Sequence, residues 1–444
     1  MTLRAPEPSA AFAIRGETFA FVADPAVVGP TAAYRYDSDG AVVVDGGIVV
    51  DTGTASTVLA RHPGIRVDHY PGKLIMAGFI DCHIHYPQTR VIASYGAQLI
   101  EWLNTYTFPA ELAFADPDHA AAIAELFFAE VLRNGTTTVS SYCTVHPQSV
   151  EAFFSAASAR NMRVAAGKVL MDRNAPSGLL DTPQSGYDQS KALIGRWHGK
   201  GRNIYAVSPR FAPTSSPEQL AIAGALWAEH PGTLMQTHVG ESTKEIAWVR
   251  ELFPDAPDYF GVYERFGLAG PGANFGHAIH LTSRERAALC DSGSGISHCP
   301  TSNTFIGSGL FDLAGTVHNS SSVPIGLATD VGGGSSFSMF ATMRTAYEIA
   351  QLRGHSLHPI QAFHLATLGS AKVLRMDDRI GNLAAGYEAD VIVLDPKSRP
   401  VLAERVSQAR SISDVLFALM ILGDDRAIVE TYIAGEKSRP KEHA

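Results

Sequence analysis

The sequence predicts an α/β fold: a (β/α)8 TIM-like barrel with a small β-sandwich domain built from both termini. Two observations support this prediction. Eight apolar, strand-like runs alternate with helix-like segments through the middle of the chain, and short β-rich runs occupy both of its ends. Buried parallel strands are typically continuous apolar runs, and eight successive βα units favour closure into a barrel.

The β-rich ends predict how the chain is divided. Residues 1–72 contain FAIRGETFAFVADP and GAVVVDGGIVVDTG, short β-rich runs separated by Gly, Asp and Pro. Residues 379–444 return to this pattern with GYEADVIVLDP and RAIVETYIAGE. We therefore expect 1–72 and 379–444 to form the sandwich domain together, and 73–378 to form the barrel.

The barrel strands are expected in eight runs. These runs are 73–81, 136–144, 163–172, 203–214, 233–242, 273–282, 295–303 and 323–333. Between the first two, 121–135 has a helical period and ends in Gly135, a residue typical of helix C-caps. A second helical run, 413–423, follows the barrel, and the sequence leaves open whether it is amphipathic or an interface element.

Composition excludes several classes of protein. Of 444 residues, 45% are apolar and 18% charged, against a usual charged share of about 25%, which favours a large interior and argues against disorder. The 35 basic and 44 acidic residues give a net charge of −9, which disfavours nucleic acid or an anionic membrane as partner. No apolar run approaches the ~20 residues of a membrane span, and the N-terminus does not read as a signal peptide. Four cysteines without a CxxC pair favour a reduced, cytoplasmic compartment.

Histidines and a carboxylate follow the predicted strands at the end where barrel active sites lie. His83 and His85 end the first run, and their His-x-His spacing places both rings on one face of a strand. His238 ends the fifth run and Asp330 the eighth. Each residue alone has an ordinary structural interpretation, but three imidazoles and one carboxylate together form a good ligand set for a first-row metal.

These residues lie in motifs that resemble a known family. FIDCHIH, THVGE, FGHAIHL and ATDVG resemble the mononuclear metal branch of the amidohydrolase superfamily, over most of the chain. Longer segments, HIHYPQTRVIASYGAQLIEWLNTYTFPAE (83–111), VSPRFAPTS and HCPTSN, resemble the guanine deaminases within it. The resemblance implies a barrel with a β-sandwich, and zinc-dependent hydrolytic deamination of guanine to xanthine and ammonia in purine catabolism.

The resemblance also implies residue roles. Glu241 would be the proton-shuttling acid and base, and His277 would orient the attacking water together with Asp330. His280 is the weaker candidate of its motif and reads as a buried supporting histidine. The implied metal ligands are His83, His85, His238 and Asp330.

The implied substrate pocket holds a purine ring. Gln88, Arg210 and Phe211 match the positions where guanine deaminases bind the base. Trp102 is a further candidate for a pocket wall, although core packing is an equally good interpretation. Lys168 lies inside the third predicted strand, where we interpret it as structural. Because the fourth run ends near Arg210 rather than in a lysine, a second metal is not expected.

The expected cofactor is one Zn2+ per chain, although iron and manganese bind the same ligands. The expected partners are guanine and water, and the family implies a homodimer. Three alternatives stay open: a deaminase of another aminopurine or a triazine, a cyclic-amide hydrolase on the same scaffold, and a metal-free binding protein. The small cytidine-deaminase type is excluded because the sequence has no P-C-x-x-C motif.

Overall fold

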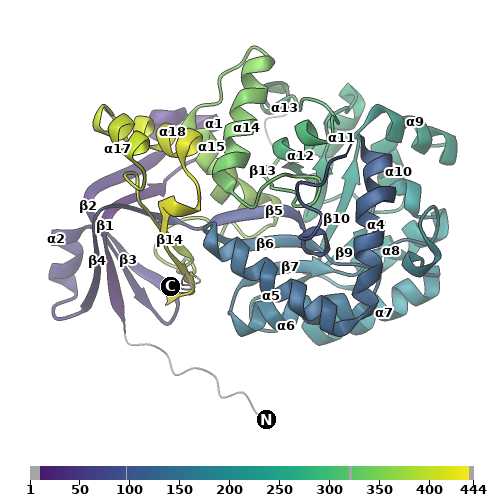
Figure 1. The fold of residues 1–444 in the computed structure, drawn as a ribbon, viewed down its shortest axis with the longest axis horizontal. Coiled ribbons are helices and arrows are strands. Elements are labelled where there is room, and N and C mark those ends of the chain that lie inside the picture. The colour runs from purple at the N-terminus through teal and green to yellow at the C-terminus, as the bar shows by residue number, and fades with distance from the viewer. Residues whose placement is uncertain (1–10, 97, 320–322, 440–444) are drawn as a thin grey trace, which may run out of the picture.

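The computed structural model describes residues 11–96, 98–319 and 323–439 and shows two sheets with helices around the larger one (Figure 1). In Figure 1 the terminal strands lie to the left and the barrel to the right. The first and last residues of the predicted sandwich segments, 1–10 and 440–444, lie outside the described residues, as does residue 97 of the long motif.

The larger sheet is a nearly closed barrel of eight parallel strands, which confirms the predicted fold class. Its hydrogen-bonded order is β5-β6-β7-β9-β10-β11-β12-β13, and the short β8 pairs with β9. At the seam between β13 and β5, the backbone N–H of Asp330 donates to the carbonyl of His83 (3.0 Å). The strands are β5 (Phe79–His85), β6 (Thr136–Tyr142), β7 (Arg163–Gly167), β8 (Val169–Leu170), β9 (Asn203–Pro209), β10 (Leu234–Val239), β11 (Ala273–His277), β12 (Gly295–His298) and β13 (Ile325–Leu327).

The first predicted strand run is divided between the two sheets. Its first half belongs to β4 (Arg66–Ala77) of the terminal sheet, and the barrel strand begins only at Phe79. Gly78 makes the transition: its N–H donates to the carbonyl of Asp390 (2.9 Å), and a Cβ there would lie 2.3 Å from Cγ2 of Thr137. The chain therefore changes sheets at Gly78, whereas the domain limits at 72/73 and 378/379 stay a prediction.

The terminal strands form one separate seven-stranded sheet in the order β16-β15-β14-β4-β1-β2-β3. β1 pairs in parallel with β4, and β4 pairs antiparallel with β14, so the C-terminal strands extend the N-terminal ones. Alternating residues of β1 pack into two clusters, Phe12 and Ile14 into one and Ala13 with Val58 of α2 (Ala55–Arg61) into another. The remaining strands are β1 (Phe12–Phe21), β2 (Tyr34–Asp45), β3 (Ile48–Thr54), β14 (Val391–Leu394), β15 (Ile428–Ile433) and β16 (Glu436–Lys437).

Helices follow most barrel strands, and many begin with a cap and a proline. In α5, the Asp116 side chain accepts from the N–H of Asp118 and Pro117 opens the first turn, which suits a residue without an N–H. This helix ends at Arg133 with Asn134 as its C-cap, so the predicted C-cap Gly135 stands one residue later, with φ +75°. The helices up to β11 are α1 (Pro25–Val28), α2 (Ala55–Arg61), α3 (Leu99–Trp102), α4 (Phe108–Leu112), α5 (Pro117–Arg133), α6 (Pro147–Ala159), α7 (Pro183–Trp197), α8 (Pro217–Glu229), α9 (Thr243–Leu252) and α10 (Tyr259–Arg265).

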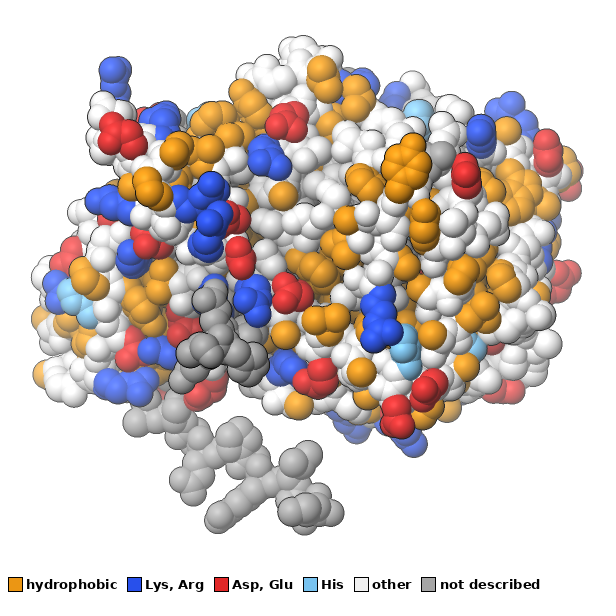
Figure 2. All heavy atoms as spheres, viewed as in Figure 1, with side chains coloured by type: hydrophobic (Ala, Val, Ile, Leu, Met, Phe, Trp, Pro, Cys, Tyr) orange, Lys and Arg blue, Asp and Glu red, His pale blue; other side chains and the backbone are white. Residues whose placement is uncertain are grey.

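The predicted helical run at 413–423 is α18, which covers the outside of the barrel. Its Leu416 and Leu419 are buried, and the helix contacts α14, α15 and α17. No helix in the described part of the chain is long and apolar enough to span a membrane. On the face drawn in Figure 2, acidic and basic side chains lie interspersed. The later helices are α11 (Ser283–Ser292), α12 (Pro300–Phe305), α13 (Leu313–Asn319), α14 (Met339–Leu352), α15 (Pro359–His364), α16 (Ser370–Val373), α17 (Pro400–Ser407) and α18 (Ile412–Leu422).

Candidate active site

A pocket opens at the carboxyl ends of the barrel strands. The sequence suggested eleven residues as ligands, catalytic groups or ring contacts. Nine of them line the pocket, and His83 is buried behind it, but His280 does not line it. The lining residues predicted from sequence are His85, Gln88, Trp102, Arg210, Phe211, His238, Glu241, His277 and Asp330.

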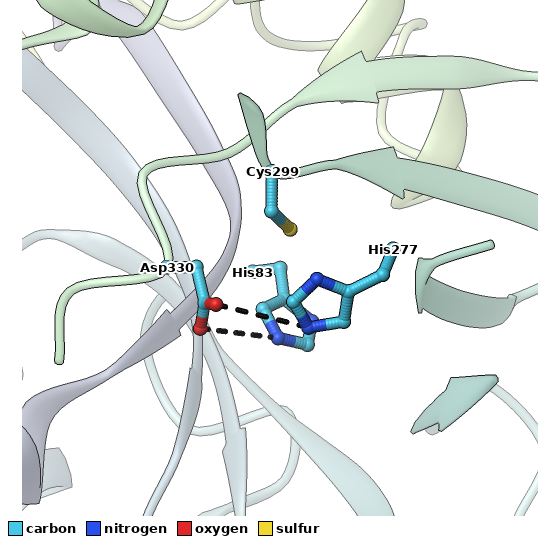
Figure 3. Close-up of side chains that lie close together, drawn as sticks. All are labelled: His83, His277, Cys299 and Asp330. Carbon is cyan, nitrogen blue, oxygen red and sulfur yellow. Dashed lines mark ion pairs between the residues drawn. The ribbon is translucent and has the colours of Figure 1, made fainter. Parts of the chain in front are cut away.

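Three histidines and one aspartate converge at the base of this pocket. The Nε2 atoms of His83 and His85 lie 3.5 and 3.3 Å from Oδ1 of Asp330. The Nε2 atom of His85 lies 3.2 Å from that of His238, and nitrogen atoms of all three rings lie within 4.8 Å of one another. Figure 3 shows His83 and His277 facing the carboxylate of Asp330.

The chemistry of this cluster fits a metal ion. His83 is fully buried, yet neither of its ring nitrogens has a hydrogen-bond partner among the described residues. Burying a polar atom without a partner is costly, and a metal would satisfy it. The Nδ1 atom of His238 contacts the carbonyl of Arg210 (2.7 Å), a contact that directs Nε2 toward the cluster. Burial holds the pKa of His85 and His238 well below the usual value, so both rings are neutral, the form that binds metals.

The position before His277 makes room for His83, a constraint that the sequence analysis did not identify. A Cβ on Gly276 of β11 would lie 2.4 Å from Cε1 of His83. The second histidine of β5, His85, is held by the buried ring of Tyr142, which stacks on it with ring centroids 4.6 Å apart. The glycine of the FGHAIHL motif was the available signal, since a glycine within a strand often marks such a close approach.

Glu241 lies beside the cluster, just after β10. Its side chain is buried, Oε2 lies 3.5 Å from Nε2 of His277, and Ser308 Oγ donates to Oε1 (3.0 Å). Burial raises the pKa of Glu241 to about 7. A carboxyl group that titrates near neutral pH can both give and take a proton, as an acid–base catalyst must.

His277 ends β11 and bridges the two carboxylates. Its Nε2 faces Glu241 and also lies 3.7 Å from Oδ2 of Asp330, while Nδ1 lies 2.8 Å from Oδ1 of Asn303. Burial alone would lower its pKa, but the charges of Glu241 and Asp330 raise it above the usual value. The contact with Asn303, in the HCPTSN motif, was not predicted.

Cys299 of the same motif lies close to this group, as Figure 3 shows. It completes a set with His83, His277 and Asp330 whose potential ligand atoms lie within 4.8 Å of one another. Burial raises the pKa of the Cys299 thiol well above its usual value. The neutral thiol is a weak ligand, so the set of three histidines and Asp330 is the better metal site.

The four residues predicted to bind a ring form one part of the lining, which we call the upper part of the pocket. Gln88 follows β5, and Arg210 and Phe211 follow β9; all three are buried. Trp102 of α3 lines the pocket and also packs against Tyr106, with ring centroids 5.0 Å apart. Both interpretations of Trp102, pocket wall and packing residue, therefore apply.

Glu111 connects two of these residues and was not predicted as functional. Its carboxylate lies 2.7 and 2.9 Å from Nη1 of Arg210 and accepts a hydrogen bond from Nε2 of Gln88 (3.3 Å). It is the last residue of the long motif at 83–111. The signal was therefore in the sequence, but nothing there showed that Glu111 contacts Arg210.

The model of the amidohydrolase family matches residues 74–437, which include every residue of this pocket. The chain belongs to the amidohydrolase family. A short second match, residues 40–64 to a bacterial imidazolonepropionase-like composite domain, lies within the terminal sheet and its helix α2.

This amidohydrolase is similar to guanine deaminases of two bacteria. It is 48% identical to a guanine deaminase of Escherichia coli over 405 residues, which are 91% of this chain and 92% of that protein. A solved E. coli guanine deaminase superposes with a TM-score of 0.94 at 46% identity, covering 96% of this chain and 99% of the other. A guanine deaminase structure from Bradyrhizobium japonicum gives a TM-score of 0.94 at 38% identity, covering 96% and 99%. The predicted resemblance is confirmed.

Two other predicted residues of this amidohydrolase lie outside the pocket lining. His280 Nε2 contacts the carbonyl of Ser308 (2.8 Å), the residue whose hydroxyl donates to Glu241. His280 thus supports the loop that holds Glu241. Lys168 forms a buried ion pair with Asp181, in agreement with a structural role.

Proposed function

We propose that this amidohydrolase is a guanine deaminase, which uses water to replace the exocyclic amine at C2 and releases xanthine and ammonia. The observation that carries the proposal is that one pocket combines the histidine–aspartate cluster, buried Glu241 and the polar pair Arg210 and Gln88. The similarity to guanine deaminases over nearly the whole chain supports it.

The proposed cofactor is one Zn2+ per chain. His83, His85, His238 and Asp330 would hold it, since three imidazoles and a carboxylate match the ligands that zinc prefers. A bound Zn2+ would lower the pKa of water from about 16 toward about 7 and so supply a nucleophile at neutral pH. Iron and manganese remain alternatives because they accept the same donors.

Glu241 would move the protons of the reaction. We propose that it protonates N3 of guanine as C2 is attacked, so that the tetrahedral intermediate carries less charge. It would then take the proton of the new C2 hydroxyl and pass it to the amine, so that C2=O forms as the C2–N bond breaks and ammonia leaves. Such transfers each contribute about 10²–10⁴ in rate. His277, held at Nδ1 by Asn303, would accept or orient the water proton together with Asp330.

The upper part of the pocket would recognise the ring by its polar edge. Arg210 would donate to O6 or N7, as arginine does to guanine in DNA, and Gln88 would accept from the neighbouring N1–H. Phe211 and Trp102 would flank the base. Adenine has no O6, so it would leave buried donors unpaired, a situation that excludes analogues strongly.

Two rival reactions use the same scaffold. A deaminase of another aminopurine or of a triazine differs in the ring that the pocket holds, and the Arg210–Gln88 pair favours a ring that carries a carbonyl. A cyclic-amide hydrolase would attack a ring carbonyl and open the ring. Only a deaminase releases ammonia and leaves the ring intact.

We further propose a cytoplasmic homodimer that acts in purine catabolism. The family resemblance supports the dimer, and the reaction product supports the metabolic role. Light scattering at several protein concentrations tests the dimer, since a constant mass of one chain would contradict it.

The test of the function is ammonia release by the purified, metal-quantified protein. Guanine, adenine, cytosine and a hydantoin are compared, with xanthine measured as the product. We expect ammonia and xanthine from guanine alone, with about one zinc per chain. Bound metal without guanine turnover would overturn the assignment of Gln88, Arg210 and Phe211 to a guanine pocket, while ring opening of the hydantoin would favour the amide hydrolase.

A further inference from the structure

Glu111 is a buried carboxylate next to the pocket that the mechanism above does not use. It lies on α4, its residue is 0% exposed, and it does not itself line the pocket. Phe108 precedes it by three residues, so the two side chains share one face of the helix. A buried carboxylate is costly unless it is paired, so its partners indicate why it is there.

Both partners of Glu111 are proposed ring-binding residues. The carboxylate contacts Arg210 Nη1 with both oxygens (2.7 and 2.9 Å) and accepts from Gln88 Nε2 (3.3 Å). Phe108 holds the same arginine from a second side, with Cζ of Arg210 5.6 Å from the ring centroid. One turn of helix therefore fixes the two polar side chains that come from different strand ends.

These contacts decide which atoms remain for a ligand. Because Nη1 of Arg210 faces Glu111, its donors at Nη2 and Nε are the ones left for a ring. Because Nε2 of Gln88 donates to Glu111, the amide oxygen is the polar atom that this pocket-lining side chain has left for a ligand; it lies against Gly332, where a Cβ would lie 2.0 Å from Oε1, next to the lining residue Gly333. Glu111 thus orients Arg210 as a donor and Gln88 as an acceptor.

We propose that Glu111 is a positioning residue that sets the hydrogen-bonding polarity of the pocket. With a donor from Arg210 beside an acceptor from Gln88, the pocket selects a ring whose carbonyl stands next to an N–H, as in guanine. Rings with the opposite order, an amine next to an unprotonated ring nitrogen, meet like groups and are rejected. This inference rests on the proposed function and deepens it.

The charge of Glu111 matters as well as its shape. Arg210 is 3% exposed, and Glu111 is the carboxylate that forms an ion pair with it. Replacing Glu111 by glutamine would leave a buried cation without its counter-charge and would offer an amide that can donate as well as accept. Both ring-binding side chains would then lose their fixed orientation.

The test compares two substrates that carry the same C2 amine. Guanine has a carbonyl at C6 and an N–H at N1, whereas 2,6-diaminopurine has an amine at C6 and an unprotonated N1. For Glu111→Gln we expect the KM of guanine to rise about 30- to 100-fold, as for other losses of one partner of a buried charged pair, with kcat much less affected. The preference for guanine over 2,6-diaminopurine should fall, and metal content should not change.

Glu285→Gln is the matched control. Glu285 is also a buried carboxylate, but it accepts from the backbone N–H groups of Phe260 (3.1 Å) and Thr282 (2.7 Å) at a helix start. Glu285→Gln should lower the melting temperature without changing the preference between the two substrates. If Glu111→Gln does not fold, Glu111→Asp keeps the charge at shorter reach and should show the same shift in preference to a smaller degree.

A double variant shows whether Glu111 acts through Arg210. In the Arg210→Met background, adding Glu111→Gln should raise the KM of guanine much less than Glu111→Gln does alone, because the effects of residues in one network are not additive. Unchanged KM and preference in a folded, metal-loaded Glu111 variant, or full additivity, would overturn the inference and leave the function standing. Absence of guanine turnover by the unaltered protein would overturn the function, and the inference with it.

Discussion

The two ends of the barrel differ in how their buried polar groups are partnered. At the carboxyl end, both ring nitrogens of His83 lack a hydrogen-bond partner among the described residues. At the amino end, Glu388 accepts from two arginines: from Nε of Arg163 (2.7 Å), at the start of β7, and from Nε of Arg202 (3.0 Å), just before β9. The carboxyl end thus leaves the ring of His83 without a hydrogen bond, whereas the amino end pairs Glu388 with arginines of the protein.

This difference separates function from stability along the barrel axis. The ion-pair network at the amino end also includes Asp390, which accepts from Nη1 of Arg202 (3.1 Å) and whose carbonyl receives the N–H of Gly78. It therefore joins the barrel to the terminal sheet where the chain passes between them. Barrel enzymes generally place their sites at the carboxyl end and residues for stability at the other.

Removing a histidine of the cluster should have the largest effect. We expect His83→Ala to lose metal content and guanine turnover together, because one of four proposed ligands is gone. Plasma emission spectroscopy and ammonia release measure the two losses. His364→Ala is the control, since His364, at the end of α15, packs against Phe21 and does not line the pocket. This variant should be less stable but should keep its metal. Normal metal content in His83→Ala would exclude His83 as a ligand.

Glu241→Gln should separate the metal from the chemistry. We expect turnover to fall about 10²–10⁴-fold, because a proton-transfer group is lost, while the metal stays bound. Single-turnover kinetics and metal analysis on the same sample check this result. Near-normal turnover would contradict the role of Glu241 as the proton shuttle, and loss of metal would instead place it in the cluster.

At the carboxyl end, strand register makes the meeting of side chains predictable from sequence. His83 and His85 lie in β5, His238 lies in β10 and Asp330 follows β13, and side-chain alternation with closure of the barrel brings them together. The ring contacts Gln88, Arg210, Phe211 and Trp102 came from the family resemblance instead. Their common pocket depends on segments between strands, whose path periodicity does not predict.

The sequence could not predict which side chains pair when they lie far apart in the chain. Glu111 and Arg210 stand 99 residues apart, and their pairing depends on how α4 approaches β9. The network of Glu388 with Arg163 and Arg202 is equally non-local. The division of the first strand run at Gly78 was missed for a related reason, since the end of β4 and the start of β5 are both apolar and only the fold separates them.

Arg210→Met should impair substrate binding and spare the metal. We expect kcat/KM for guanine to fall about 10²-fold, because a buried charged donor to the ring is lost. The carbonyl of residue 210, which contacts Nδ1 of His238, is retained in this variant, so metal content should hold. Isothermal titration with xanthine measures the lost affinity directly. Unchanged kinetics would remove Arg210 from the ring pocket.

A change at the amino end should have the smallest effect on activity, because it should leave catalysis unchanged. We expect Glu388→Gln to lower the free energy of unfolding by about 1–3 kcal/mol at pH 7, since two arginines lose a charged partner. Its kcat/KM for guanine should match that of the unaltered protein. Urea denaturation and steady-state kinetics measure the two quantities, and a large loss of activity would contradict the separation of the two ends.

The pH dependence of this stability difference tests its electrostatic origin. Burial alone would raise the pKa of Glu388, but Arg163 and Arg202 outweigh it and hold the pKa below the usual 4.5. A carboxyl group with a lowered folded pKa stabilises the fold above its unfolded pKa, and this contribution is lost as the pH falls through the folded pKa. The difference in stability between the unaltered protein and Glu388→Gln should therefore be constant above about pH 5 and shrink below pH 4.5. A difference that persists unchanged at low pH would assign the effect of Glu388 to packing, and the amino end would then be stabilised by shape rather than by paired charge.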